Sequence, residues 1–158
     1  MRACLPAALA ALALLAGCGG DEQPGKAAYE RAFNAAREDF SERVRALDQP
    51  GRDAPAEERA AAGEQVAAEI SRFVDELEAI EPPPDAAAAH DDLTAAFQES
   101  ADLTAEAAQA VREGDDAALR AIERRLSDRS STDKRAEDAV QVLVEQGYVL
   151  DLDFELGR

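Results

Sequence analysis

The sequence is short of cysteine, histidine and aromatic residues. Its 158 residues include two cysteines, one histidine and no tryptophan. Both cysteines, Cys4 and Cys18, lie near the N-terminus. The chain from residue 19 onward therefore has no thiol, which excludes a disulfide framework, a cysteine-ligated metal site and a cysteine nucleophile there. We expect packing alone to hold its folded part together.

Positive charge is also scarce. There are 17 lysines and arginines against 34 aspartates and glutamates, which gives a formal net charge of −17. A surface of this sign repels phosphate backbones, so we expect no nucleic-acid partner. It also repels anionic lipid head groups, so the body of the protein should stand off from a bilayer.

Large apolar side chains are sparse as well, and aromatic residues make up only 4% of the chain. Together with the high net charge, this composition makes disorder a competing interpretation. Alanine supplies much of the missing apolar content and is the best helix former. Because the larger apolar residues recur at helical spacing, we favour a helical domain over a disordered one.

Motifs of common enzyme classes are absent from the sequence. It contains no phosphate-binding loop, no nucleophile elbow and no zinc-protease motif. Acidic residues are so frequent that no carboxylate pair stands out as an acid and base couple. We therefore expect no enzyme activity and no cofactor.

The N-terminal segment has the pattern of a secretory leader. Arg2 supplies the positive start, and an apolar stretch from Leu5 to Ala16 follows. As a helix this stretch would span only about 18 Å, short of the roughly 30 Å of a bilayer core. Two competing interpretations are an uncleaved anchor over residues 3–20 and an ordinary secreted protein with a chance cysteine.

The leader ends in the residues Leu15, Ala16, Gly17 and Cys18. These residues form a lipobox, and in them the chain resembles bacterial lipoproteins. The resemblance implies that residues 1–17 are a signal peptide and that Cys18, acylated by chains such as palmitate, becomes the first residue of the mature protein. Two or more acyl chains anchor a protein stably, whereas one holds it only marginally. The resemblance thus implies a lipid-anchored protein of the cell envelope, outside the cytoplasm.

The rest of the chain divides into a lipidated cysteine with a polar linker, residues 18–25, and one helical domain, residues 26–158. Apolar periodicity predicts the first three helices at about 26–47, 55–80 and 85–113. A proline and glycine turn and a run of three prolines separate them. The stripe of the first helix illustrates the one-face spacing: Tyr29, Phe33, Ala36, Phe40, Val44 and Leu47.

The end of the third predicted helix carries a strong turn signal. Gly114 suits the position just past a helix, and Asp115 suits the cap of the next, which predicts a tight antiparallel pair. The last predicted helix continues to Gly147 as one long helix with a polar middle, and a break near Ser130 and Ser131 is the competing interpretation. Four segments of similar length predict an all-α, up-down-up-down four-helix bundle.

The last residues alternate between apolar and other side chains. We interpret them as an extended tail that lies with its apolar side on the bundle. A short fifth helix and a partner-binding strand are the alternatives. The apolar set that would face the bundle, or a partner, is Tyr148, Leu150, Leu152, Phe154 and Leu156.

Two groups of polar residues on the third predicted helix are candidates for chemistry. His90 lies on its buried edge, where we expect a capping or packing role, because metal sites need several convergent ligands and no second histidine exists. Ser100 and Thr104 occupy core positions that would lie level with Arg129 and Asp133. These four could form a polar layer or line a small polar cavity, but hydroxyls bonded to their own backbone explain the pattern more simply.

The sequence therefore predicts a non-enzymatic, membrane-tethered module that binds or scaffolds another envelope protein or component. The composition of the domain is similar to that of small helical lipoproteins from GC-rich bacteria, most of which have no assigned activity. An alternative function, suggested by the acidic surface, is binding of a small cationic solute or a divalent ion. A hydrolase with His90 as its base is a third hypothesis.

Overall fold

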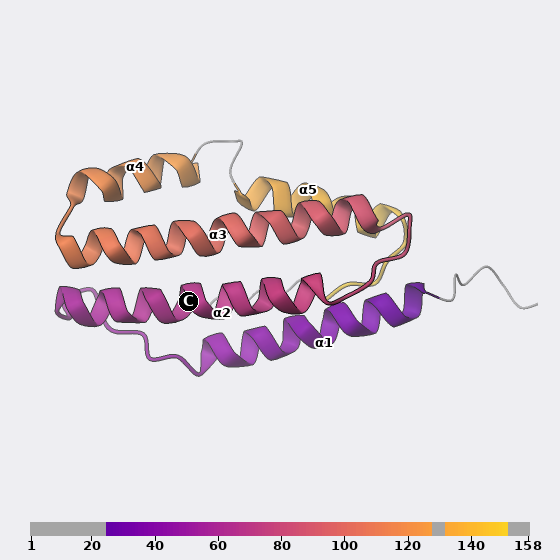
Figure 1. The fold of residues 1–158 in the computed structure, drawn as a ribbon, viewed down its shortest axis with the longest axis horizontal. Helices are drawn as coiled ribbons and strands as arrows, with labels where there is room; N and C mark the ends of the chain where they lie inside the picture. The colour runs from indigo at the N-terminus through magenta and orange to yellow at the C-terminus, as the bar shows by residue number, and fades with distance from the viewer. Residues whose placement is uncertain (1–24, 128–131, 152–158) are drawn as a thin grey trace, which may run out of the picture.

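The computed structural model describes residues 25–127 and 132–151. Within these residues the chain is all-helical, as predicted, with five helices and no strand. In Figure 1, α2 and α3 lie side by side, α1 packs along α2, and α4 and α5 follow one another along α3. The helices are α1 (Lys26–Arg45), α2 (Ala56–Glu78), α3 (Ala87–Glu113), α4 (Asp116–Ser127) and α5 (Thr132–Glu145).

The prediction of one long final helix is wrong. The described residues form two helices there, α4 and α5, and each packs on α3. The physical reason lies in the sequence, because residues 127–134 are polar on every side and offer no apolar face to hold a helix against α3. Buried side chains occur on both sides of this stretch, at Ile122 in α4 and at Leu143 in α5. The predicted point of a break, Ser130 and Ser131, lies outside the described residues.

The contact between α2 and α3 is built from small side chains. A Cβ atom placed on Gly63 would lie 3.0 Å from the Cβ of Ala108. Ala60 and Ala67 of α2 and Ala101 of α3 are also buried. Small residues let two helix backbones approach closely, which is how a chain with few large apolar residues can fill this interface.

Aromatic rings fill the core where α1, α2 and α3 meet. The rings of Phe40 and Phe73 stack with their centroids 4.8 Å apart, and Phe97 meets Phe73 edge-on at 4.9 Å. Phe33 and Phe73 are completely buried. Such pairs add to the free energy gained from burial of the apolar surface alone.

The turn between α3 and α4 confirms the glycine and cap signal of the sequence. Gly114 has a φ of 67°, and the N–H of Asp115 donates to the carbonyl of Ala110 at 2.9 Å. The Asp115 carboxylate in turn accepts from the N–H groups of Ala117 and Ala118, both at 2.9 Å. One residue pair therefore ends α3, begins α4 and reverses the chain.

Candidate functional site

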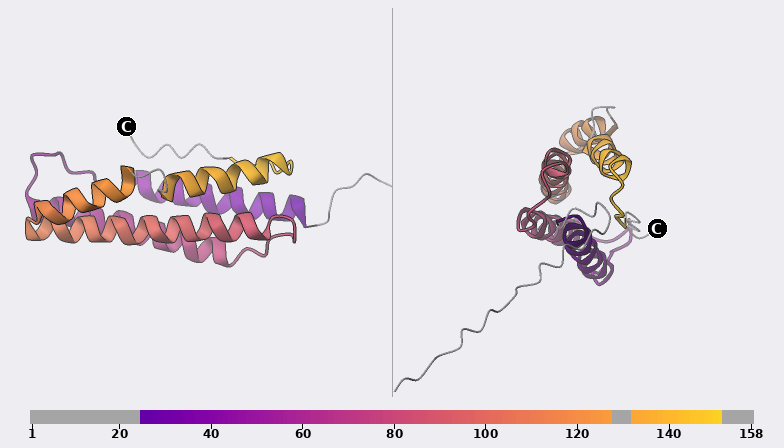
Figure 2. Two further views of the ribbon diagram at one scale, coloured as in Figure 1. Left: turned by 90° about the horizontal axis from the view of Figure 1, so that it is seen from above. Right: turned by 90° about the vertical axis from the view of Figure 1, so that its right-hand side faces the viewer.

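A second left-handed glycine ends α5 and redirects the chain. Gly147 has a φ of 81°, the N–H of Tyr148 donates to the carbonyl of Leu143 at 3.0 Å, and the N–H of Gly147 donates to that of Val144 at 2.9 Å. This is a Schellman motif. It directs the following residues, 148–151, from α5 toward α1 (Figure 2). We call residues 148–151 the C-terminal segment.

Three polar side chains of α1 hold the backbone of the C-terminal segment. Glu30, Asn34 and Arg37 are four and three residues apart, so they share one face of the helix, which we call the α1 polar row. The Asn34 amide donates to the carbonyl of Val149 at 3.2 Å and accepts from the N–H of Asp151 at 2.8 Å. The Glu30 carboxylate accepts from the N–H of Val149 at 2.8 Å, and Arg37 pairs with the Asp151 carboxylate.

The side chains of the C-terminal segment alternate between core and solvent. Tyr148 is buried, Val149 is 73% exposed, and Leu150 is partly buried against the core. The described segment has no helical residue, so these four residues follow the extended interpretation of the tail. The fifth-helix alternative also rests on residues beyond 151, which the structure does not describe, and it stays a prediction. The remaining apolar residues of the predicted tail lie outside the described residues: Leu152, Phe154 and Leu156.

Tyr148 is the anchor of this segment. Its hydroxyl donates to the Asp85 carboxylate at 2.9 Å, and its ring meets that of Tyr29 edge-on at 5.5 Å. Lys26 lies over the same ring, 4.7 Å from its centroid, and donates to the carbonyl of Gln146 at 3.1 Å. Burial raises the pKa of Tyr148 to about 12, and its hydrogen bond to Asp85 acts in the same direction.

His90 is buried next to this anchor and caps α2. Because a carbonyl can only accept, the Nε2 of His90 carries the proton that it donates to Leu77 at 3.1 Å. Its Nδ1 then accepts from the Tyr29 hydroxyl at 3.1 Å. Burial lowers the pKa of His90. Both ring nitrogens are used in internal bonds, which is the geometry of a capping and packing histidine.

The structure describes two of the four side chains of the predicted polar layer, those of Ser100 and Thr104. The Thr104 hydroxyl donates to the backbone carbonyl of Ser100 at 2.7 Å, which is the simpler arrangement expected for these residues. Neither hydroxyl lines the open groove of about 480 Å³ between α3 and α4. Arg129 and the side chain of Asp133 lie outside the described part, as does Cys18.

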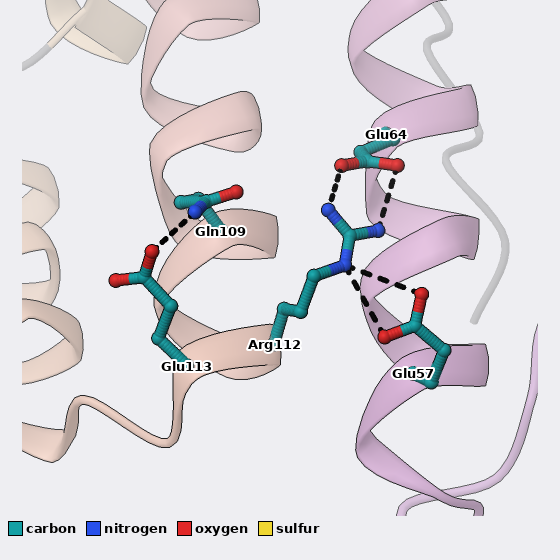
Figure 3. A network of polar contacts seen from close by, with 5 residues as sticks. All are labelled: Glu57, Glu64, Gln109, Arg112 and Glu113. Atoms are coloured by element: carbon teal, nitrogen blue, oxygen red, sulfur yellow. Dashed lines mark hydrogen bonds and ion pairs between the residues drawn. The ribbon is translucent and has the colours of Figure 1, made fainter.

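Carboxylates between α2 and α3 are occupied by an arginine. Figure 3 shows Arg112 of α3 reaching across to Glu57 and Glu64 of α2. The hydrogen bond from Arg112 lowers the pKa of Glu64, and the same bond raises the pKa of Arg112. In the described ranges, no three side chains of His, Cys, Asp and Glu form a group that could hold a metal ion.

The α1 polar row is the part of the site that sequence reasoning missed. Its residues each follow a member of the apolar stripe by one position, so that Glu30, Asn34 and Arg37 border the buried face. An asparagine inside a helix next to the core, flanked at helical spacing by two charged residues, was the available signal. Such a residue has poor helix propensity, so its side chain is a candidate for hydrogen bonds to another segment.

Comparison with known proteins gives no relative from which a role could be transferred. No family model matches the chain, and neither a curated protein nor a solved structure matches it. Across residues 25–127 and 132–151, no helix has the length and apolar character needed to cross a membrane.

Proposed function

We propose that this protein is a lipid-anchored lipoprotein of the cell envelope, outside the cytoplasm, and that its helical domain binds or scaffolds another envelope protein or component without catalysis. The observation that carries the proposal is the lipobox, which ends at Cys18 and is followed by a short polar linker that leads into α1. The internally bonded His90 supports a non-catalytic role, because neither ring nitrogen is directed at a substrate.

The position of α1 gives the proposed anchor an orientation. The stretch between Cys18 and Gly25 can extend by at most about 25 Å. Lys26 binds the carbonyl of Gln146, so the start of α1 and the end of α5 lie at the same end of the domain, at the right in Figure 1. A lipid on Cys18 would therefore hold this end, with the C-terminal segment, near the membrane.

We also propose that the domain is a variant of the up-down-up-down four-helix bundle. In this arrangement α1, α2 and α3 are the first three rods, and α4 and α5 share the position of the fourth (Figure 2). The C-terminal segment then lies where the first and last rods would meet, because it contacts α1 directly after leaving α5.

Replacement of the cysteine tests the anchor. We expect the wild-type chain to stay with the membrane fraction after an alkaline wash and to incorporate labelled palmitate. Cys18→Ala should lose both properties, because no thioether can form. Cys4→Ala is the matched control and should keep both, since in the proposal its residue is removed with the leader. Firm membrane attachment of Cys18→Ala without label would contradict the proposal.

A second candidate function is binding of a small cationic solute or a divalent ion. The observation that favours it is the net charge of −17. Titration calorimetry with calcium and with a polyamine at physiological salt tests it. A saturable heat would support this function, whereas no heat and no shift in melting temperature would reject it.

A further inference from the structure

We propose that protonation of His90 releases the C-terminal segment from α1, so that this end of the domain is a pH-sensitive switch. The segment stays docked while the imidazole is neutral and leaves α1 when the imidazole takes up a proton. This device goes beyond the binding role proposed above. It requires neither the lipid anchor nor a partner, so it stands or fails independently of that role.

A continuous row of buried ring contacts links His90 to the C-terminal segment. The ring of Tyr29 meets the ring of His90 edge-on, with centroids 5.6 Å apart, and meets that of Tyr148 edge-on at 5.5 Å. Each of these three residues is at most 3% exposed. Tyr148 is held there by its bond to Asp85. Departure of Tyr148 would therefore open Tyr29, and with it the bond between Tyr29 and His90, to water.

The hydrogen bonds of His90 fit only a neutral ring. Its Nε2 donates to the carbonyl of Leu77, and its Nδ1 accepts from the Tyr29 hydroxyl, both at 3.1 Å. A protonated ring carries a donor on each nitrogen, so Nδ1 and the hydroxyl would then direct two hydrogens at each other. The hydroxyl would have to turn away and give up its acceptor. A buried donor without an acceptor raises the free energy of the docked form.

Other groups around this row differ from His90 in the pH at which such groups ordinarily titrate. The titratable and charged side chains come from α1, the turn before α3, α3 itself and the C-terminal segment: Lys26, Tyr29, Asp85, Asp91 and Tyr148. From α2, His90 meets a backbone carbonyl. Carboxylates ordinarily titrate near pH 4, and tyrosine and lysine near 10. Between about pH 7.5 and about pH 5.5, the imidazole is therefore the member that changes charge.

The direction of the switch follows from burial. Burial lowers the pKa of His90 in the docked form and outweighs the bond to Leu77 and the charge of Asp91, which both act in the opposite direction. When the segment leaves and water reaches the ring, the pKa returns toward its ordinary value of about 6.5. The released form then binds the proton more tightly than the docked form does. Acid therefore shifts the equilibrium toward release.

The segment is attached weakly enough for one proton to matter. Val149 is 73% exposed, and the ion pair between Arg37 and Asp151 has a carboxylate partner that is 52% exposed. Exposed polar contacts contribute little each, so the segment can open locally while the helices stay folded. One proton changes the equilibrium between docked and released forms by at most about tenfold per pH unit. A change of this size is sufficient for a segment of four residues but small for a whole domain.

Thiol labelling reports the position of the segment. In the full chain with Cys4→Ser and Cys18→Ser, Leu150→Cys places a thiol on the half-buried side of the segment, and Val149→Cys places one on its exposed side. The ratio of their reaction rates with a maleimide removes the pH dependence of the thiol chemistry. We expect this ratio to rise at least about fivefold from about pH 7.5 to about pH 5.5. His90→Gln keeps a donor and an acceptor but does not titrate, so its ratio should stay constant.

A third thiol distinguishes local release from unfolding of the domain. Ala139 lies in α5 and is 5% exposed. In the same cysteine-free background, the thiol of Ala139→Cys should stay unlabelled over the whole pH range while that of Leu150→Cys reacts. Circular dichroism at each pH checks that the helices persist.

The coupling must also act in the reverse direction, because linkage between two sites is reciprocal. His90 is the only histidine in the sequence, so the NMR signal of an imidazole ring proton follows its protonation alone. Tyr148→Ala removes the anchor of the segment and should raise the pKa of His90 toward its ordinary value. Val149→Ala is the matched control, since Val149 points to solvent, and should leave the pKa of His90 unchanged.

Four results would each overturn the proposal. A labelling ratio that stays constant with pH would show that acid does not release the segment. An equal rise in the His90→Gln chain would show that another group senses the pH. Labelling of Ala139→Cys in step with Leu150→Cys would mean that the whole domain opens. An unchanged pKa of His90 in a folded Tyr148→Ala chain would contradict the coupling, and if that variant does not fold, the labelling ratios decide.

Discussion

The two tyrosines report on the end of the domain where the C-terminal segment docks. Tyr29 and Tyr148 are the only tyrosines in the sequence. Burial raises the pKa of each to about 12. The hydrogen bond to Asp85 raises the pKa of Tyr148 further. The charge that Tyr148 would carry when ionised raises the pKa of Tyr29 further. Their hydroxyl contacts therefore depend on both rings staying protonated.

We predict that the folded chain forms almost no phenolate at about pH 10, whereas the chain in urea is half ionised there, because an unperturbed tyrosine titrates at about 10. Since the folded pKa is the higher one, this contribution to the free energy of unfolding is complete below about pH 10 and is lost as the pH rises toward 12. Ultraviolet difference spectroscopy measures the fraction of phenolate at each pH. Identical titration midpoints for the tyrosines in buffer and in urea would contradict the burial of their hydroxyls.

Because His90 is buried, we predict that the protein loses stability at acidic pH. Burial lowers its pKa in the folded state, so the unfolded chain binds the proton more readily once the pH falls below about 6.5. Protonation would also place a donor on Nδ1, opposite the Tyr29 hydroxyl that now donates to it. We expect the stabilising contribution of His90 to be present above about pH 6.5 and to fade below it.

Carboxylates titrate at lower pH, so the effect of His90 is best isolated as a difference. His90→Gln should lower the free energy of unfolding by about 1–3 kcal/mol near neutral pH, through imperfect pairing of buried polar groups. The gap between wild type and variant should narrow as the pH falls from about 7 to about 5. Urea unfolding at several pH values checks this. A gap that stays constant would show that His90 is not held neutral by the fold.

At the scale of the helices, the turn at Asp115 is the sharpest test of local structure. Its carboxylate accepts two N–H groups at the start of α4, and α4 packs chiefly on α3. Asp115→Ala should destabilise the fold by about 1 kcal/mol, within the usual range of about 0.5–2 kcal/mol for a lost cap. Asp115→Asn keeps an acceptor and should cost much less. Equal losses for both variants, measured by urea unfolding, would argue against a capping role.

Close packing of α2 on α3 gives a second prediction for the elements. Valine at position 63 would drive its methyl groups into Ala108, because even a single Cβ lies only 3.0 Å away. We expect Gly63→Val to lower the free energy of unfolding by about 1–3 kcal/mol, as overpacked cores do. Gly51→Val is the matched control, since nothing lies within 4 Å of a Cβ there. A Gly63→Val variant as stable as this control would mean that the helices are farther apart.

The sequence predicts the elements better than it predicts the site. The first three helices begin and end within two residues of the expected limits, because prolines, glycines and a regular apolar stripe mark them. The last helix was mispredicted because a single helix to Gly147 would match the other three in length, whereas residues 127–134 offer no apolar face. The α1 polar row escaped prediction for a different reason: Asn34 binds backbone atoms of residues 149 and 151, and periodicity within one helix does not encode such distant partners.

At the scale of the whole molecule, the net charge of −17 means that acidic side chains repel one another across a small helical protein. Arginines partly offset it by bridging helices, as Arg43 does with Glu69 and Glu76, and as Arg112 does with Glu57 and Glu64. Exposed pairs such as those of Arg112 contribute only about 0–1 kcal/mol each, and salt weakens them, whereas the partly buried pairs of Arg43 are screened less. The surplus of acidic charge repels itself over longer distances, and salt relieves this repulsion.

Because the surplus of negative charge is large and each exposed bridge contributes little, we expect the repulsion to dominate. The melting temperature should therefore rise when sodium chloride increases from about 0.01 M to about 0.15 M, where the screening length falls to about 8 Å. A fall in melting temperature would mean that the arginine bridges dominate instead. Calcium chloride at matched ionic strength is the informative comparison. If calcium chloride stabilises the chain no more than sodium chloride does, screening explains the whole effect and divalent-ion binding loses its support. A larger rise in melting temperature that saturates with calcium concentration would indicate that calcium binds to the folded chain.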